Sequence, residues 1–198
     1  MKRLALPIVL VIWLAAACGG LGAIARYSHR AGPSAFSQPQ WPPNSTLTFN
    51  QNHFNLVLAL HPQCSCSNAT LSELEKIISG SGERLTVHAL VVLPENAPAN
   101  WRESDLVAQL NALPHIQILF DRNGTEANRF SALTSGQALL FSPDGQRVFR
   151  GGITESRGHV GENAGEQTIV ALLQRKPALC DETPVYGCNL HNSVEAQR

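Results

Sequence analysis

The feature that most constrains the fold is a mostly apolar run that ends at two cysteines and passes at once into a helix-like segment. Residues 55–60 form the run, and Cys64-Ser65-Cys66 follows it after His61 and Pro62. From residue 65 to 79, apolar side chains recur at the three- and four-residue spacing of an amphipathic helix. This pattern predicts a buried strand, two thiols at the strand–helix junction, and an α/β fold.

The rest of the chain continues the alternation of strands and helices. Apolar runs and amphipathic spacing predict strands at 55–60, 85–93, 115–120, 137–141 and 146–150, and helices at 65–79, 103–110, 127–132 and 163–175. Ser142-Pro143-Asp144-Gly145 has the composition of a turn between the last two strands, and Asn163 suits the start of the last helix. We therefore expect a central mixed sheet with flanking helices, preceded by one N-terminal transmembrane helix.

The first 26 residues have the composition of a membrane anchor or an export signal. Leu4 to Ile24 carries no charge and matches the ~20 residues of a membrane-spanning helix. A cleaved signal ending at Ala15-Ala16-Ala17 is one alternative, and a lipoprotein signal with Cys18 as the acceptor is another. We expect an uncut, single-pass anchor at the cell membrane through residues 4–24. All three interpretations place the remaining chain in the periplasm or outside the cell.

Composition divides the rest into three parts. Residues 27–44 are rich in proline and small polar residues and predict a linker that holds the domain off the membrane. Residues 45–176 are expected to form the α/β domain, and 177–198 a tail with two more cysteines. With 15 basic and 15 acidic residues and no basic stripe, the chain gives no support to nucleic-acid binding.

The two cysteines at the junction indicate thiol chemistry. Main-chain N–H groups at a helix N-terminus stabilise a thiolate, which is the form that attacks disulfides. Cys64 is the expected nucleophile and Cys66 the resolving thiol, with His61 and Pro62 in supporting roles. A disulfide across one intervening residue is geometrically constrained, and strain makes a disulfide easier to reduce. The predicted function is a membrane-tethered thiol–disulfide oxidoreductase that acts on protein thiols or disulfides outside the cytoplasm and needs no cofactor.

Metal binding is the alternative interpretation of the same residues. Thiolate and imidazole groups are suitable ligands for Cu(I) and Zn(II). Cys64 and Cys66 would supply two ligands, and His159, in a glycine-rich loop after the last strand, is the best third candidate. On this interpretation the protein would bind copper for an envelope or respiratory complex.

The cysteines of the tail leave two alternatives open. Cys180 and Cys188 are close enough in sequence to form a small disulfide loop. Alternatively, Cys188 lies near Cys64 as a third thiol, which would let electrons pass between two pairs.

The segment after the last predicted strand has two interpretations, which rest on Gly151-Gly152 and Arg157. It could form an anion site or a tight turn that needs glycine, and we favour the turn.

Residues 50–175 resemble a thioredoxin-like domain in element order, in the cysteine pair between strand and helix, and in the late hairpin. More narrowly, the chain is similar to the membrane-anchored bacterial RedB-like branch of that superfamily. The matching stretches are His61 to Cys66, Gly151 to Thr154, Ser156 to His159 and Thr183 to Cys188. The resemblance places Gly136 where thioredoxins carry a cis-proline beside the cysteines. That difference leaves room for a metal, and the resemblance supports Cys188 more than Cys180 as a further functional thiol.

Overall fold

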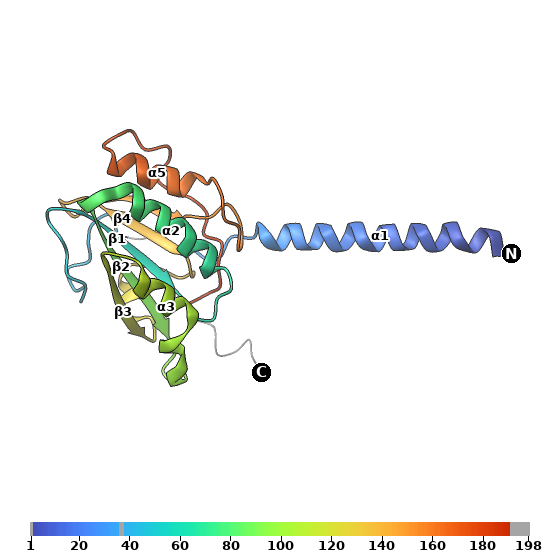
Figure 1. Cartoon of the computed structure of the whole chain (residues 1–198), viewed down its shortest axis with the longest axis horizontal. Coiled ribbons are helices and arrows are strands. Elements are labelled where there is room, and N and C mark those ends of the chain that lie inside the picture. Colours follow the sequence, from blue (N-terminus) through green and yellow to red (C-terminus); the bar gives the residue numbers. More distant parts are fainter. Residues whose placement is uncertain (1, 36–37, 191–198) are drawn as a thin grey trace. The chain divides into compact units, whose positions relative to one another are not determined.

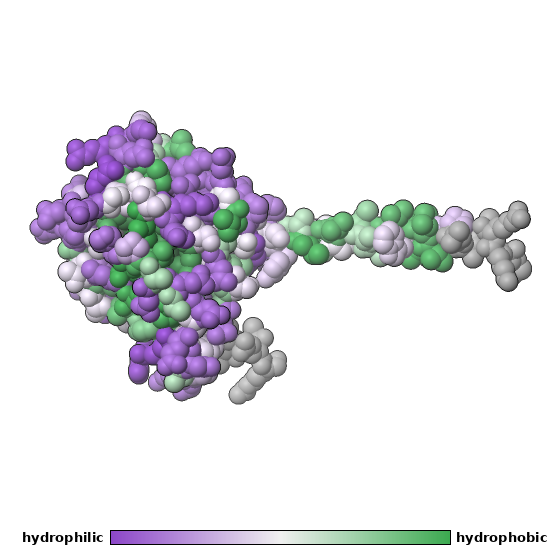
Figure 2. Space-filling model, in the orientation of Figure 1, coloured by the Kyte–Doolittle hydropathy of each residue, from purple (hydrophilic) through white to green (hydrophobic). Residues whose placement is uncertain are grey.

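The computed structural model describes residues 2–35 and 38–190, which form two compact units that divide after Arg30. The first unit is helix α1 (Lys2–Ser28) (Figure 1). Its segment Pro7–Ser28 has a mean hydropathy of 2.4 and is long and apolar enough to cross a membrane. Figure 2 shows apolar side chains along α1. An anchor and a cleaved signal both give such a helix, so the choice between them stays a prediction.

The second unit is built on a five-stranded mixed sheet. The strands are β1 (Phe54–Leu60), β2 (Leu85–Leu93), β3 (Ile116–Arg122), β4 (Gln137–Phe141) and β5 (Arg147–Gly152). Their order in the sheet is β3-β2-β1-β4-β5. β1, β2 and β3 run parallel, whereas β4 pairs antiparallel with both β1 and β5. β1 is therefore a central strand, and its carboxyl end leads into the cysteines.

Helices and loops cover both faces of the sheet. The helices are α2 (Ser67–Ser81), α3 (Asp105–Ala112), α4 (Thr125–Arg129) and α5 (Ala164–Leu173), with short 3₁₀ turns η1 (Gly82–Arg84) and η2 (Ala99–Glu103). α2, α3 and α5 pack over one face (Figure 1). α4 and the segments before β1 and after α5 pack over the other face. Alternate residues of β1 enter the two cores, as the two-residue period of a strand requires.

The sequence predictions agree with this architecture, with shifts at element ends. β2 and β4 have the predicted bounds. The turn between β4 and β5 closes through a hydrogen bond from the N–H of Gly145 to the carbonyl of Ser142 (2.9 Å). The Asn163 side chain caps α5 by accepting from the N–H of Glu166 (2.8 Å). α2 begins at Ser67, two residues later than predicted, so both cysteines precede the helix. The residues between β1 and α2 form turns instead, which changes how the thiols are positioned.

From residue 31 onward, the segment predicted as a linker (residues 27–44) packs on the domain, including Trp41, for which packing was the favoured prediction. Residues 31–35 and 38–50, here called the strap, lie on the domain. The main-chain N–H of Gly32 donates to the carbonyl of Val185 (2.8 Å), and that of Trp41 donates to the carbonyl of Gly145 (2.9 Å). The Trp41 ring packs against four other rings, those of Phe49, His88, Phe130 and Phe141. The aromatic and hydrogen-bonding groups of the strap make it part of the fold, which the proline content alone does not reveal.

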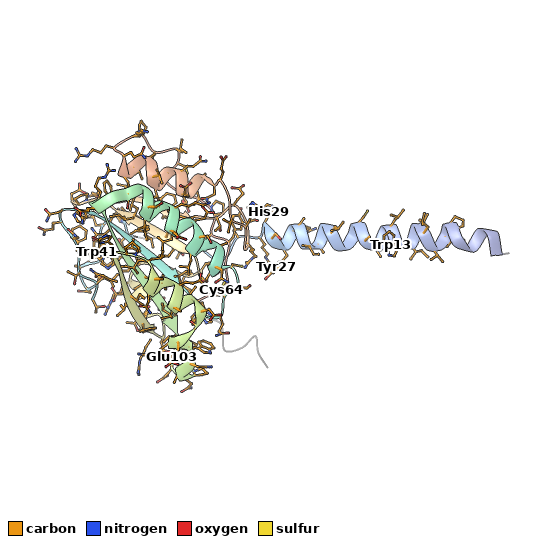
Figure 3. The ribbon with its side chains drawn as sticks, in the orientation of Figure 1. Trp13, Tyr27, His29, Trp41, Cys64 and Glu103 are labelled. Carbon is orange, nitrogen blue, oxygen red and sulfur yellow. The ribbon has the colours of Figure 1, made fainter. Side chains whose placement is uncertain are left out.

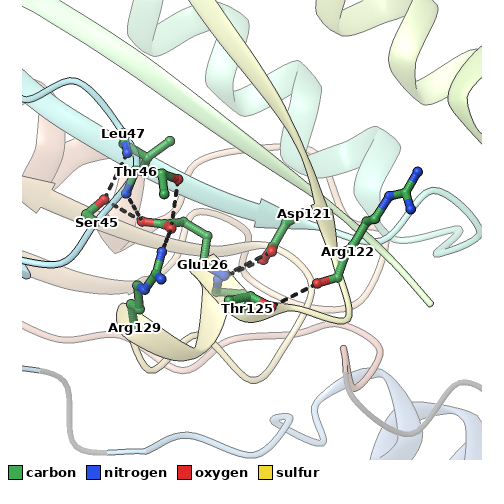
Figure 4. Close-up of polar contacts among 9 residues, drawn as sticks. Ser45, Thr46, Leu47, Asp121, Arg122, Thr125, Glu126 and Arg129 are labelled. Carbon is green, nitrogen blue, oxygen red and sulfur yellow. Dashed lines mark hydrogen bonds and ion pairs between the residues drawn. The ribbon is translucent and has the colours of Figure 1, made fainter. Parts of the chain in front are cut away.

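The carboxylate of Glu126, in α4, binds the strap to the domain (Figure 4). Its carboxylate accepts hydrogen bonds from the Ser45 hydroxyl and from both the N–H (3.1 Å) and the hydroxyl (2.9 Å) of Thr46, and it pairs with Arg129. Burial alone would raise the pKa of Glu126, but these hydrogen bonds lower it overall. The carboxylate thus stays charged at neutral pH and holds three donors of the strap.

We expect Glu126→Ala to lower the free energy of unfolding by about 2 kcal/mol, because it leaves partly buried donors of Ser45 and Thr46 without their acceptor. Urea denaturation of both proteins measures the change. Glu75→Ala, at an exposed position of α2, is the matched control and should change stability by less than ~0.5 kcal/mol. Equal stabilities for Glu126→Ala and the unmodified protein would contradict the role given to this carboxylate.

The described part of the tail, residues 177–190, is also fixed to the domain. The Thr183 N–H donates to Arg150 (3.2 Å) and its hydroxyl to Gly152 (2.7 Å), so the tail lies along the edge of β5. Gly151 and Gly152 therefore lie in β5 and not in the tight turn that we predicted. A side chain at either position would overlap the backbone of the tail, which explains the two glycines by close approach. Residues 191–198 lie outside the described residues.

Candidate active site between β1 and α2

Cys64 lies in the turns that join β1 to α2. Its N–H donates to the main-chain carbonyl of His61 (3.0 Å), and its own carbonyl accepts from the N–H of Ser67 (3.0 Å). Cys66 occupies the N-cap position of α2. These turns bring the main-chain N–H of Cys66 to the Cys64 sulfur.

Polar groups surround the Cys64 sulfur even though only 4% of the residue is exposed. A hydrogen bond from the Cys188 thiol lowers the pKa of Cys64 more than any other single interaction. Burial opposes ionisation, while the main-chain N–H groups of Cys188 and Cys66 and the Ser67 hydroxyl favour it. Together they lower the pKa of Cys64 to about 4, so this cysteine is a thiolate at neutral pH.

The two neighbouring thiols keep their protons. Burial, followed by the charge on Cys64, raises the pKa of Cys66, and Arg157 offsets part of this effect. For Cys188, the hydrogen bond to Cys64 and then burial raise the pKa above the ordinary range of a thiol. One thiolate is therefore held between two protonated thiols, with the guanidinium of Arg157 close by.

Arg157 is a positively charged neighbour of the cysteines that the sequence did not predict. Its guanidinium donates to the carbonyl of Gly187 (2.6 Å) and acts electrostatically on both Cys66 and Cys188. The groups on which it acts are thus two cysteine thiols of the protein itself. The residue is more than 90 positions from Cys64 in sequence, and no local spacing signals the pairing.

His61 contacts the turn and is neutral. Its Nδ1 accepts from the N–H of Gln63 (3.2 Å), which places the ring proton on Nε2. Burial lowers the pKa of His61, and the charge on Cys64 offsets this only in part. The ring packs edge-on against Trp101 with 5.3 Å between ring centroids, and its Nε2 is buried without a hydrogen-bond partner among the described residues. Pro62 is buried beside it.

Gly136 lies just before β4, and its neighbour Ser135 makes the contacts to the cysteine turn. The Ser135 hydroxyl accepts from the N–H of His61 (2.9 Å) and lies 3.2 Å from the Ser67 hydroxyl. Gly136 instead donates its N–H to Ala59 at the end of β1 (2.8 Å) and has a φ of +91°, which favours glycine. Gly136 thus occupies the predicted place before β4, and its supporting role stays a prediction.

An open depression of about 500 Å³ gives access to Cys64. Cys64 and Glu103 come from the two segments that border it, and both are labelled in Figure 3. The complete lining comprises Pro62, Gln63, Cys64, Ser65, Asn68, Asn100, Glu103, Ser104, Asp105 and Leu106. The lining is largely polar and carries two carboxylates, those of Glu103 and Asp105.

The remaining predicted site residues lie elsewhere. The Cys180 sulfur contacts the Thr168 hydroxyl of α5 (3.4 Å), whereas Cys188 contacts Cys64, so the structure does not bring the two tail cysteines together. His159 is exposed in the loop before α5. Within residues 2–35 and 38–190, no group of three His, Cys, Asp or Glu side chains has the arrangement of a metal site. Copper handling stays a prediction from the sequence.

Comparisons with known proteins agree with the fold. No family model and no curated protein matches the chain. An uncharacterized conserved protein from Geobacillus kaustophilus matches with a TM-score of 0.64 and 15% identity, over 81% of this chain and 95% of its own. A hypothetical protein from Sinorhizobium meliloti matches with a TM-score of 0.58 and 20% identity, over 83% and 95%. At these identities the likeness concerns the fold alone.

A secreted disulfide oxidoreductase from Mycobacterium tuberculosis, homologous to DsbE of E. coli, matches less closely, with a TM-score of 0.44 and 11% identity over 64% of this chain and 84% of its own. This third match carries no functional information by itself. The narrower RedB-like relationship stays a prediction. The strand order, the antiparallel β4–β5 hairpin and the cysteines between β1 and α2 give the globular unit the thioredoxin-like fold that the sequence predicted.

Proposed function

We propose that this protein is a membrane-tethered, extracytoplasmic thiol–disulfide oxidoreductase that reacts through the Cys64-Ser65-Cys66 turn. One observation carries the proposal: the Cys64 sulfur is held as a thiolate by main-chain and thiol donors, and residue Cys64 borders an open depression. A cysteine kept only for packing needs neither a stabilised charge nor access to solvent. Reactive cysteines need both.

The proposed reaction starts with attack by Cys64 on one sulfur of a substrate disulfide. A mixed disulfide forms, and the other substrate sulfur leaves as a thiolate that takes a proton from solvent. A second protein thiol then attacks Cys64, releases the remaining substrate thiol and leaves the protein oxidised by two electrons. Cys66 is the resolving thiol predicted from the sequence. The same steps in reverse would let the oxidised protein oxidise a substrate dithiol.

The depression supports a polypeptide substrate over a small molecule. It is shallow and open, whereas sites for small molecules bury most of their ligand. Glu103 and Asp105 add negative charge to its border, which favours a substrate segment with basic residues beside its cysteine. The apolar helix α1 supports tethering, which would restrict the domain to partners at the same membrane.

We expect Cys64→Ser to slow thiol–disulfide exchange by about 100-fold or more, because it removes the attacking sulfur. The assay uses the full chain in detergent micelles with a fluorescent peptide disulfide and with oxidised glutathione. Cys180→Ser is the matched control, because Cys180 contacts α5 and not the cysteine turn, and it should exchange at the unmodified rate.

Two results would contradict the proposal. One is exchange by Cys64→Ser at the rate of the unmodified protein. The other is a redox titration, read by thiol trapping and mass spectrometry, in which Cys64 stays reduced throughout the range of biological potentials.

A further inference from the structure

From the placement of the tail we infer that Cys188, and not Cys66, is the first thiol to resolve the mixed disulfide on Cys64. This inference rests on the proposed function and adds a catalytic residue to it. In thiol–disulfide exchange the resolving sulfur must reach the sulfur under attack. The side chain and main chain of Cys188 both contact the Cys64 sulfur, which meets that requirement in the reduced protein.

The tail is positioned by the domain and does not depend on the cysteines for its place. The N–H of Ser135 donates to the carbonyl of Cys188 (2.8 Å), and Arg157 donates to the carbonyl of Gly187 (2.6 Å). On the far side, the N–H of Leu190 donates to Leu133 (2.9 Å), and the Leu190 side chain is buried in the core. These contacts hold Cys188 from both sides, so little conformational entropy is lost when its sulfur attacks.

The same contacts connect Cys188 to the turn that carries Cys64. Ser135 binds the tail through its N–H, and through its hydroxyl it accepts from His61 and contacts Ser67. Ser135 is therefore a common support for the tail and the cysteine turn. A link of this kind has no purpose in a tail that merely closes its own disulfide loop.

Cys66 is less suited to the first resolving step. It is separated from Cys64 by one residue, and a disulfide of that span is geometrically constrained. Cys188 approaches from a separate segment of chain and is free of that constraint. Cys66 instead contributes its main-chain N–H to the Cys64 thiolate.

The electron and proton balance of the step is complete. The Cys188 sulfur attacks the Cys64 sulfur, the Cys64–substrate bond breaks, and a Cys64–Cys188 disulfide forms. The departing substrate sulfur takes the proton that Cys188 carried. In the reduced protein that proton is held by the negative charge on Cys64, which disappears once Cys64 is bound to substrate. A protein or small-molecule dithiol would return the Cys64–Cys188 pair to the reduced state.

The test follows one turnover with oxidised glutathione as the disulfide. The full chain in detergent is reduced, mixed with glutathione disulfide, quenched with an alkylating agent and mapped by peptide mass spectrometry. We expect Cys64 linked to Cys188 and Cys66 alkylated. A dominant Cys64–Cys66 disulfide with Cys188 alkylated would overturn the inference.

Single variants give a second readout of the same step. In Cys188→Ser the Cys64–glutathione adduct should persist about tenfold longer or more, because the intramolecular thiol is gone. The control Cys180→Ser should resolve it at the unmodified rate, and Cys66→Ser should resolve it faster than Cys188→Ser. Persistence in Cys66→Ser, or equal rates in Cys66→Ser and Cys188→Ser, would overturn the role of Cys188 while leaving the proposed function intact. If neither glutathione disulfide nor the peptide disulfide forms an adduct in any protein with Cys64, the proposed function itself fails.

Discussion

Gly187→Ala is expected to lift the tail from the domain and to separate Cys188 from Cys64 while leaving every cysteine in place. A methyl group at Gly187 would overlap the carbonyl of Ser135, and that carbonyl belongs to the backbone and cannot rotate away. Overpacking of this kind costs about 1–3 kcal/mol, which the tail avoids by moving. Its movement would also break the hydrogen bond from Arg157 to the Gly187 carbonyl.

Two measurements follow this change. Limited proteolysis should cut the tail of Gly187→Ala faster than that of the unmodified protein. The pH at which Cys64 becomes half alkylated should rise, because its strongest hydrogen-bond donor has moved away. Gly80→Ala is the matched control: Gly80 lies in α2 with open space around the added methyl, and alanine there should stabilise the helix by roughly 0.5–1 kcal/mol. An unchanged titration of Cys64 in Gly187→Ala would show that the tail does not set its acidity.

The sequence predicted the sheet because each strand carries its own local signal. β2 is buried at every residue and is apolar except at Thr86 and His88, and the Ser142–Gly145 turn marks the β4–β5 hairpin. The attachment of the strap has no such local signal. Its prolines indicate an extended linker, but its attachment depends on Glu126, which lies about 80 residues away. Local composition gives the conformation of such a segment and not the surface that it contacts.

The candidate site also has one part that the sequence locates and another part that it does not. Cys64 and Cys66 are adjacent to a strand and a helix, so periodicity locates them. The start of α2 at Ser67 was missed, and the donors that act on Cys64 come as much from Cys188 as from the turn before that helix. Ser135 and Arg157 reach the site only through the folding of β4, β5 and the tail. Contacts between segments so distant in sequence follow from the complete topology and not from any motif.

Cys188→Ala is expected to raise the pKa of Cys64 by about 2 units or more, because it removes the hydrogen bond that contributes most to the low value. In the unmodified protein the rate of iodoacetamide alkylation at Cys64 should be half-maximal near pH 4, the pKa of this thiol. In Cys188→Ala the midpoint should lie well above that value. Each unit of increase leaves about tenfold less thiolate at a pH below both midpoints.

The same shift makes the stability of the reduced protein depend on pH. Because folding lowers the pKa of Cys64, the folded state releases this proton at a lower pH than the unfolded chain. The resulting stabilisation grows as pH rises from about 4 toward the usual range of a thiol, and it is lost as pH falls through about 4. Urea denaturation between pH 4 and 8 should therefore show a weaker pH dependence for Cys188→Ala than for the unmodified protein.

Cys66→Ala is the control for both measurements, because it keeps the main-chain N–H that Cys66 directs at Cys64 and removes only a thiol of smaller influence. Its alkylation midpoint should stay near that of the unmodified protein. If Cys66→Ala shifts the midpoint and Cys188→Ala does not, the thiolate is stabilised within the turn alone. The tail would then have no part in making Cys64 reactive, and the coupling between the tail and the turn through Ser135 would serve the fold only.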